Sequence, residues 1–351
     1  MAMWPLIRLL PKQTKFKYVK FSWFFGIVSI VACAVSLVSM FTGGLRENPI
    51  AVYQEAEGTP LARMGAIMEH GFNLGIDFRG GIAILVEAPN PIDVGALRAL
   101  GNAVQDGGSE VQRTSCRPVD GPPYCAILSL GVTEGGTNAV EAVRAGLPAV
   151  ADGARIANVD AVSGKVSEEL FSGGLIALGL AILLMLVYIW FRFEWQFGLG
   201  AVLGLFHDVI LTLGMFSLFR IEFTLTIIAA LLTIIGYSMN DTVVVYDRIR
   251  ENLRKYKKMP LSELIDLSLN ETLSRTIMTG CTALMALVGL LILGGEALSG
   301  FAIAMIFGIV IGTYSSLYVA APAILIWGVK RGREGGGKQS AGGAAESPAG
   351  V

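Results

Sequence analysis

Six long apolar blocks constrain this chain more than any other feature of its sequence. Each is long enough to cross the roughly 30 Å hydrocarbon core of a bilayer as a helix. The blocks are Phe21–Thr42, Leu170–Phe191, Trp195–Phe219, Phe223–Tyr246, Thr276–Gly295 and Ala297–Val329. Only 16% of all residues are charged, whereas a soluble domain carries about 25%. We therefore predict an α-helical membrane protein with six transmembrane helices.

Lysine and arginine in the short connections predict the orientation, because they collect on the cytoplasmic side. Five lie in residues 1–20 and six in residues 248–258 after the fourth block, whereas the short connections on the other side offer little beyond Arg220. We expect both termini to be cytoplasmic. The predicted division is an N-terminal segment at 1–20, the first helix at 21–42, an external domain at 43–168, helices two to six at 169–329 and a disordered cytoplasmic tail at 330–351.

The external segment shows the order strand, helix, strand, strand, helix, strand. Alternating and helical apolar patterns place these elements at Gly81–Ala88, Ile92–Val104, Glu110–Thr114, Tyr124–Val132, Thr137–Val150 and Arg155–Val162. A βαββαβ order predicts a small α+β ferredoxin-like domain, in which two helices cover one sheet.

Two cysteines of the external domain flank the turn of its predicted hairpin. Cys116 and Cys125 would lie in an oxidising compartment, so a disulfide between them is predicted, with two free thiols as the alternative. Residues 77–81 (DFRGG) are glycine-rich, but a helix does not follow them directly, so we interpret them as a tight entry into a strand. No cysteine and histidine cluster has metal-site spacing, and we expect no metal or cofactor.

The fourth block carries polar side chains at helical spacing. The row comprises Thr233, Tyr237, Asn240, Asp241, Val244 and Arg248. A carboxylate in a membrane span costs about 2.5–3.5 kcal/mol on insertion scales. We therefore expect Asp241 to face other helices or a water-filled crevice, where it can bind and release protons. The alternative is a buried network that only determines helix packing, although an amide or hydroxyl would do this at lower cost.

Two further polar positions accompany Asp241. His207 and Asp208 are adjacent in the third block and can satisfy each other, so a structural role stays open beside a functional one. Arg275 precedes the fifth block. Asp241 lies about 7.5 Å from the basic end of its helix at 1.5 Å per residue, a distance that arginine covers along its stem. We expect Arg275 to approach Asp241 in a pair that protonation would release.

The sixth block carries a continuous row of small residues. Ala304, Gly308, Gly312, Ser316 and Ala320 recur at every fourth position. Such rows let the backbones of two membrane helices approach closely. We predict that this face packs against another helix, in this chain or in a partner.

Four motifs together resemble the SecF family. They are GIDFRGG at 75–81, LFHDV at 205–209, GYSMNDTVVVYDRIREN at 236–252 and LNETLSRT at 269–276. SecF is a membrane subunit of the SecDF complex of bacterial protein export, in the resistance-nodulation-division superfamily. Members of that superfamily have twelve spans in two pseudo-symmetric halves, so the resemblance implies SecD as a heterodimeric partner and places the external domain in the periplasm.

The resemblance also implies a function that is not enzymatic. The proton motive force would assist preprotein translocation across the inner membrane after the SecA step at SecYEG, with YajC as a further partner, unfolded preproteins as substrates and no nucleic acid. Asp241 matches the family's proton-conducting aspartate and Arg275 the arginine beside it, with His207, Asp208, Tyr237 and Asn240 as supporting candidates. The alternatives are a half-size proton-coupled small-molecule exporter of the same superfamily and a passive membrane scaffold.

Overall fold

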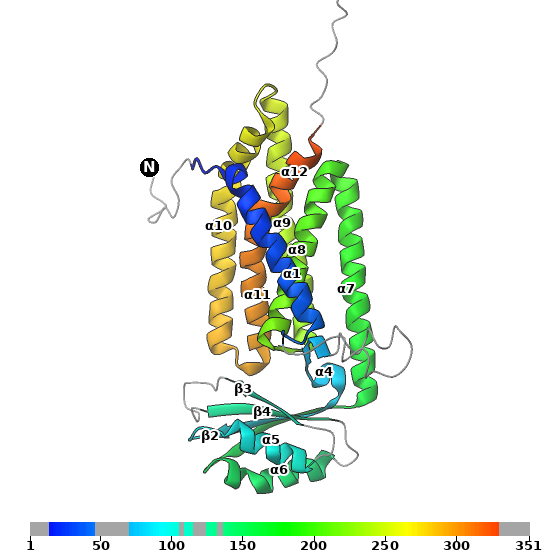
Figure 1. Cartoon of the computed structure of the whole chain (residues 1–351), viewed down its shortest axis with the longest axis vertical. Helices are drawn as coiled ribbons and strands as arrows, with labels where there is room; N and C mark the ends of the chain where they lie inside the picture. The colour runs from blue at the N-terminus through cyan, green and yellow to red at the C-terminus, as the bar shows by residue number, and fades with distance from the viewer. Residues whose placement is uncertain (1–13, 46–69, 105–108, 115–123, 132–135, 330–351) are drawn as a thin grey trace, which may run out of the picture.

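The computed structural model describes residues 14–45, 70–104, 109–114, 124–131 and 136–329. Within them, six helical spans are long and apolar enough to cross a membrane, which confirms the sequence prediction. They are α1 (Tyr18–Phe41), α7 (Gly164–Arg192), α8 (Trp195–Phe219), α9 (Leu225–Lys255), α10 (Leu261–Leu293) and a last span built from α11 (Glu296–Ser315), the π-helical turn η1 (Ser316–Ala320) and α12 (Ala321–Trp327). The spans form one bundle, with a sheet at one end (Figure 1).

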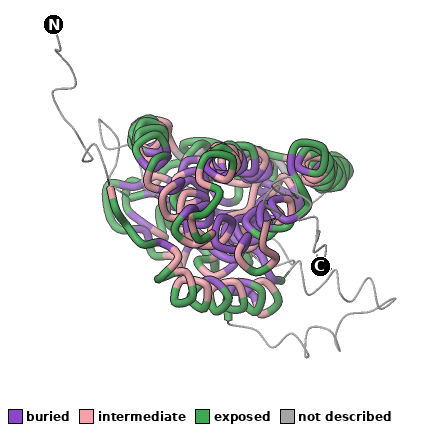
Figure 2. Tube along the Cα trace, turned by 90° about the horizontal axis from the view of Figure 1, so that it is seen from above, coloured by how far each residue is buried: buried purple, intermediate pink, exposed green. Residues whose placement is uncertain are grey.

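Helices α8, α9 and α11 form the centre of this bundle. In the central spans about half or more of an apolar 18-residue stretch is buried, against 17% of such a stretch in α1, 11% in α10 and 6% in α7. Figure 2 shows the buried residues gathered in the middle and the exposed ones at the edge. The outer helices present large apolar side chains such as Ile176 and Trp190, as expected of surfaces that face lipid.

The sheet domain (Gly81–Val162) lies between α1 and α7 in the sequence. It consists of β2 (Gly81–Ala88), α5 (Val94–Val104), β3 (Ser109–Thr114), β4 (Tyr124–Leu130), α6 (Gly136–Val150) and β5 (Arg155–Val162). The strand order is β3-β4-β2-β5, and every neighbouring pair is antiparallel. This is the predicted βαββαβ arrangement, and the fold class is confirmed.

The sheet domain has its core on one face of the sheet only. Alternate residues of β2, among them Ile84 and Val86, are fully buried with Leu97 of α5 and Val143 of α6. Helices α5 and α6 lie on the side of the sheet that faces away from the helix bundle (Figure 1). The other face of the sheet therefore points toward the membrane helices.

The helices α9 and α10 continue well beyond their apolar blocks, and this corrects one prediction. The basic residues after Tyr246 were assigned to a connection, yet α9 runs to Lys255 and α10 begins at Leu261. Polar contacts explain the extension: Arg248 Nε donates to Glu271 Oε2 at 2.7 Å, and Asn252 Nδ2 donates to the same oxygen at 2.8 Å. These side-chain pairs join the two helices beyond the apolar blocks, together with buried apolar residues such as Ile249 and Leu264.

The last span contains a π-helical turn at Ser316–Ala320. The structural reason is Pro322, which has no backbone N–H to donate to the carbonyl four residues earlier and so breaks the regular α-helical pattern. The turn also brings the Ala320 carbonyl to the Tyr246 hydroxyl, which donates to it at 3.0 Å.

Candidate functional site

Asp241 lies inside the bundle on α9 and is 8% exposed. Helix α10 runs beside α9, and the Thr276 hydroxyl donates to Asp241 Oδ1 at 2.7 Å. No other donor among the described residues reaches this carboxylate. One of its oxygens thus accepts from a hydroxyl, and no described donor reaches the other.

Arg275 is the residue next to Thr276 on α10, and its side chain is exposed. Helix α10, which carries it, packs against α9, which carries Asp241. In the part of the chain that the structure describes, however, no ion pair joins the two side chains. The structure thus places Arg275 on the helix that packs against α9, without the predicted salt bridge to Asp241.

A second carboxylate, Asp208, lies on α8 and is 1% exposed. Its Oδ1 lies 2.9 Å from His207 Nδ1, and its Oδ2 accepts hydrogen bonds from Ser238 of α9 and Ser315 of α11. With the carboxylate ionised, His207 Nδ1 carries the hydrogen and donates. Three donors therefore surround Asp208, which satisfies a buried charge far better than the single donor at Asp241.

The His207 ring extends this network toward α1. Its Nε2 lies 3.2 Å from Ser29 Oγ, which lies 2.8 Å from the Tyr314 hydroxyl of α11. Tyr314 in turn donates to the Phe25 carbonyl at 2.8 Å. The network thus joins α1, α8, α9 and α11, which favours a structural role for His207 and Asp208.

The two carboxylates are connected through α9. Ser238, which donates to Asp208, precedes Asp241 by three residues, so both lie on the inward side of this helix one turn apart. A shift of α9 would therefore act on both carboxylates at once.

The remaining polar residues of the predicted row lie elsewhere on α9. Asn240 and Thr233 are exposed and Tyr237 is half-buried, whereas Asp241 is buried. The row does not form one face of α9, because adjacent residues such as Asn240 and Asp241 point about 100° apart on a helix of 3.6 residues per turn.

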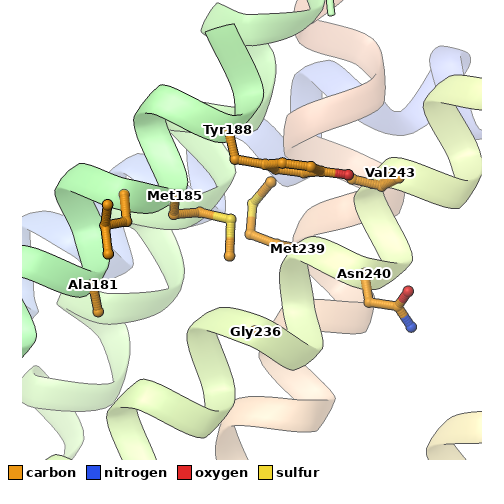
Figure 3. A pocket seen from close by; sticks show the side chains of 8 residues that line it. Ala181, Met185, Tyr188, Gly236, Met239, Asn240 and Val243 are labelled. Carbon is orange, nitrogen blue, oxygen red and sulfur yellow. The ribbon is translucent and has the colours of Figure 1, made fainter. Parts of the chain in front are cut away.

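Asn240 lines a pocket of about 450 Å³ between α7 and α9. Figure 3 shows Ala181, Met185 and Tyr188 of α7 facing α9 across this pocket. Its lining is largely apolar, and it lies outside the inward face that holds Asp241.

The row of small residues lies against the centre of the bundle, and all five members are buried. A Cβ atom at Gly308 would overlap Ile234 of α9, and one at Gly312 would lie 2.9 Å from Ser238 Cβ. Further along, Ala320 Cβ lies 3.3 Å from the Cβ position of Gly204 on α8. The short side chains are what allow α11 and η1 to approach α9 and α8 closely.

Sequence reasoning missed the hydroxyl partners of both carboxylates. Thr276 follows Arg275 directly, and Ser238 stands one turn before Asp241, so both lie next to residues that the sequence had marked as candidates. Ser29 and Ser315 lie on helices whose neighbours only the tertiary structure defines, and no pattern in the sequence marks them.

The predicted disulfide stays a prediction, because Cys116 lies outside the described residues, while Cys125 is buried on β4. Among the described residues, no group of three or more His, Cys, Asp or Glu side chains could hold a metal ion. The predicted tail at 330–351 and the segment at 1–13 also lie outside the described residues.

Comparison with known proteins identifies the family. Residues 143–330 match the model "Protein export membrane protein SecD/SecF, C-terminal", and residues 65–88 match "SecD/SecF GG Motif". The chain is 40% identical to protein translocase subunit SecF of Rhodobacter capsulatus, over 93% of both chains. The chain belongs to the SecF family of protein translocase subunits. This is a family of transport proteins rather than enzymes, and its members are multi-pass membrane proteins.

Other relatives agree with this assignment. SecF of Cereibacter sphaeroides is 46% identical over 77% of this chain and 85% of its own length. The crystal structure of SecDF from Thermus thermophilus matches with a TM-score of 0.72 and 31% identity, covering 90% of this SecF-family chain. The chain spans only 39% of that SecDF chain, in which SecD and SecF halves are named together.

Proposed function

We propose that this SecF-family subunit uses the proton motive force to assist translocation of preproteins across the bacterial inner membrane, after the SecA-driven step at SecYEG. The observation that carries the proposal is Asp241, a buried carboxylate with one hydrogen-bond donor and a cation on the adjacent helix. Asp208, in contrast, is satisfied by three donors. Asp241 is therefore the carboxylate that exchanges a proton.

Proton binding at Asp241 favours one helix arrangement over another. An ionised buried carboxylate is costly without a cation, so deprotonation draws Arg275 toward it. Protonation at the free oxygen removes the charge and the attraction, while the Thr276 hydroxyl can keep its hydrogen bond to Oδ1. A gradient that supplies protons from one side would thus drive α9 and α10 through a cycle of two arrangements.

SecD is the proposed partner, and the uncovered side of α9 supports this. Asn240 and Thr233 are exposed on a membrane-spanning helix, and no described residue hydrogen-bonds to the Asn240 amide. Such a group needs protein or water around it within a bilayer. A second set of six helices, which would complete the length of the SecDF chain, would cover this side; SecYEG, SecA and YajC are proposed as further members of the assembly.

The proposed orientation in the membrane rests on which end of the helix bundle carries the basic residues. The start of α1 and the connection between α9 and α10, where the basic residues gather, lie at the end opposite the sheet domain (Figure 1). Both termini would therefore be cytoplasmic and the sheet domain periplasmic.

The test is the variant Asp241→Asn in vesicles that contain the complex with SecD. The asparagine is nearly isosteric and can still accept from Thr276, so complex recovery and ATP-driven export should stay intact. Export should lose only the component that an uncoupler removes in the wild type, and Asp241→Glu should keep part of it. A variant Asp241→Asn with full uncoupler-sensitive export would favour the passive scaffold, and proton-driven small-molecule efflux without SecD would favour the exporter.

A further inference from the structure

The motif at residues 75–81 lies where the sheet domain meets the membrane helices. Just before it, β1 (Asn73–Leu74) pairs in parallel with β6 (Glu222–Phe223), the short strand that precedes α9. The Gly75 backbone N–H extends this pairing by donating to the Phe223 carbonyl at 2.9 Å. The start of the motif is therefore bonded to the connection between α8 and α9.

Asp77 makes the contact that reaches α9 itself. Its Oδ2 accepts from the backbone N–H of Leu225, the first residue of α9, at 2.9 Å. The N-cap residue Thr224 offers no side-chain cap, because its hydroxyl is bonded to the Thr226 hydroxyl instead. A carboxylate at this end also stabilises the helix dipole. The cap of α9 thus comes from a segment nearly 150 residues earlier in the chain.

The short helix α4 (Ile76–Arg79), which carries Asp77, is also tied to α7. The Ser167 hydroxyl lies 2.8 Å from the Asp77 carbonyl and 3.2 Å from the Ile76 carbonyl. Phe78 packs between Phe171 of α7 and Phe223, with ring centroids 5.5 and 5.9 Å away. Helix α4 is therefore held by the first turns of both α7 and α9.

Only Gly80 separates α4 from β2, which begins at Gly81 and is one of the two interior strands of the sheet. Gly80 and Gly81 have φ angles of 72° and 120°, which other residues rarely adopt. A Cβ at Gly81 would also overlap the Leu130 carbonyl of β4. The turn is thus short and closely packed, and a displacement of α4 passes directly into β2 and its neighbours β4 and β5.

We propose that the Asp77 segment is the mechanical coupling between α9 and the sheet domain. This inference rests on the proposed function, in which proton exchange at Asp241 moves α9. Leu225 lies 16 residues before Asp241 on the same helix, about 24 Å away along its axis. A rotation or shift of α9 at Asp241 therefore reaches its first residue, and the Asp77 carboxylate carries it to β2.

The coupling can be measured without export, by hydrogen exchange in the purified complex with SecD. Asp241→Asn imitates the protonated state and should change exchange at residues 225–241 and at residues 81–88. Asp77→Ala removes the bond to Leu225, so in the double variant the change at 81–88 should vanish while the change within α9 remains. Asp152→Ala removes an exposed carboxylate from the sheet domain and, as the matched control, should leave both changes intact.

A second variant protects the test against misfolding. Asp77→Asn keeps an oxygen that can accept from Leu225, so it should retain the change at 81–88. In vesicles, Asp77→Ala should lower the uncoupler-sensitive part of export about tenfold or more, since a hydrogen bond to a charged group carries about that factor in an equilibrium. If Asp77→Ala does not fold, the change in hydrogen exchange at residues 81–88 in Asp77→Asn remains as the test.

Three results would overturn the coupling. Each concerns the change in hydrogen exchange at residues 81–88 that Asp241→Asn causes. The coupling is overturned if this change persists when folded Asp77→Ala is also present, or if it is lost when folded Asp77→Asn is also present. It is overturned as well if Asp241→Asn alone causes no change there. Failure of the proposed function looks different: export by Asp241→Asn would stay sensitive to the uncoupler whatever residue occupies position 77.

Discussion

Replacing Gly312 by alanine tests whether the close approach of α11 and α9 holds the bundle together. The added Cβ would lie 2.9 Å from Ser238 Cβ and 3.4 Å from Ser238 Cα. Both atoms are fixed to the α9 backbone, so no side-chain rotation relieves the contact. Carbon atoms pack at about 3.5–4.0 Å, and the two helices would have to separate by about 0.6–1.1 Å at this point.

The expected loss of stability has two parts. Overpacking of a well-packed core costs about 1–3 kcal/mol. Separation also stretches one of the two bonds that Asp208 Oδ2 accepts, from Ser238 of α9 and Ser315 of α11, and a hydrogen bond to a charged group contributes about 1.5–3 kcal/mol. Alanine gains about 1 kcal/mol over glycine in a helix. The free energy of unfolding should therefore fall by about 1.5–5 kcal/mol, the sum of these three contributions.

The assay is thermal denaturation in detergent of the purified protein in complex with SecD, together with its recovery. Gly289→Ala on α10 is the matched control, because nothing lies within 4 Å of its Cβ position, and it should be neutral or slightly stabilising. Gly312→Ala should melt at a clearly lower temperature. Equal melting temperatures for the two variants would refute the packing argument.

Two further predictions concern the polar groups. Asp208→Asn should lower the free energy of unfolding by about 1–3 kcal/mol, because an amide cannot accept from His207, Ser238 and Ser315 as a carboxylate does; thermal denaturation checks this, and stability equal to the wild type would contradict it. Arg275→Ala should impair uncoupler-sensitive export strongly and Arg275→Lys should only weaken it, since lysine supplies the charge without the planar fork; wild-type export by Arg275→Ala would show that the charge is not required.

Much of the architecture could be predicted because it depends on local patterns. A span must be apolar over its whole length, and β2 must alternate to place Ile84 and Val86 in one core. Each of these patterns can be recognised within a single stretch of about ten to twenty residues. The extension of α9 and α10 was missed for the opposite reason: the bond between Arg248 and Glu271 joins residues on two helices, and neither helix shows it alone.

The sequence by itself determined that six helices cross a membrane, that a βαββαβ domain separates the first two, and that Asp241 is a charge placed where it is costly. These follow from hydrophobic length, period and the price of an ionised group in lipid. Only the tertiary structure decided that three donors hydrogen-bond to Asp208, that the Thr276 hydroxyl donates to Asp241, and that Asp77 caps the start of α9. Hydrogen bonds depend on distances of about 3 Å between atoms, and such distances between distant residues exist only once the helices are packed.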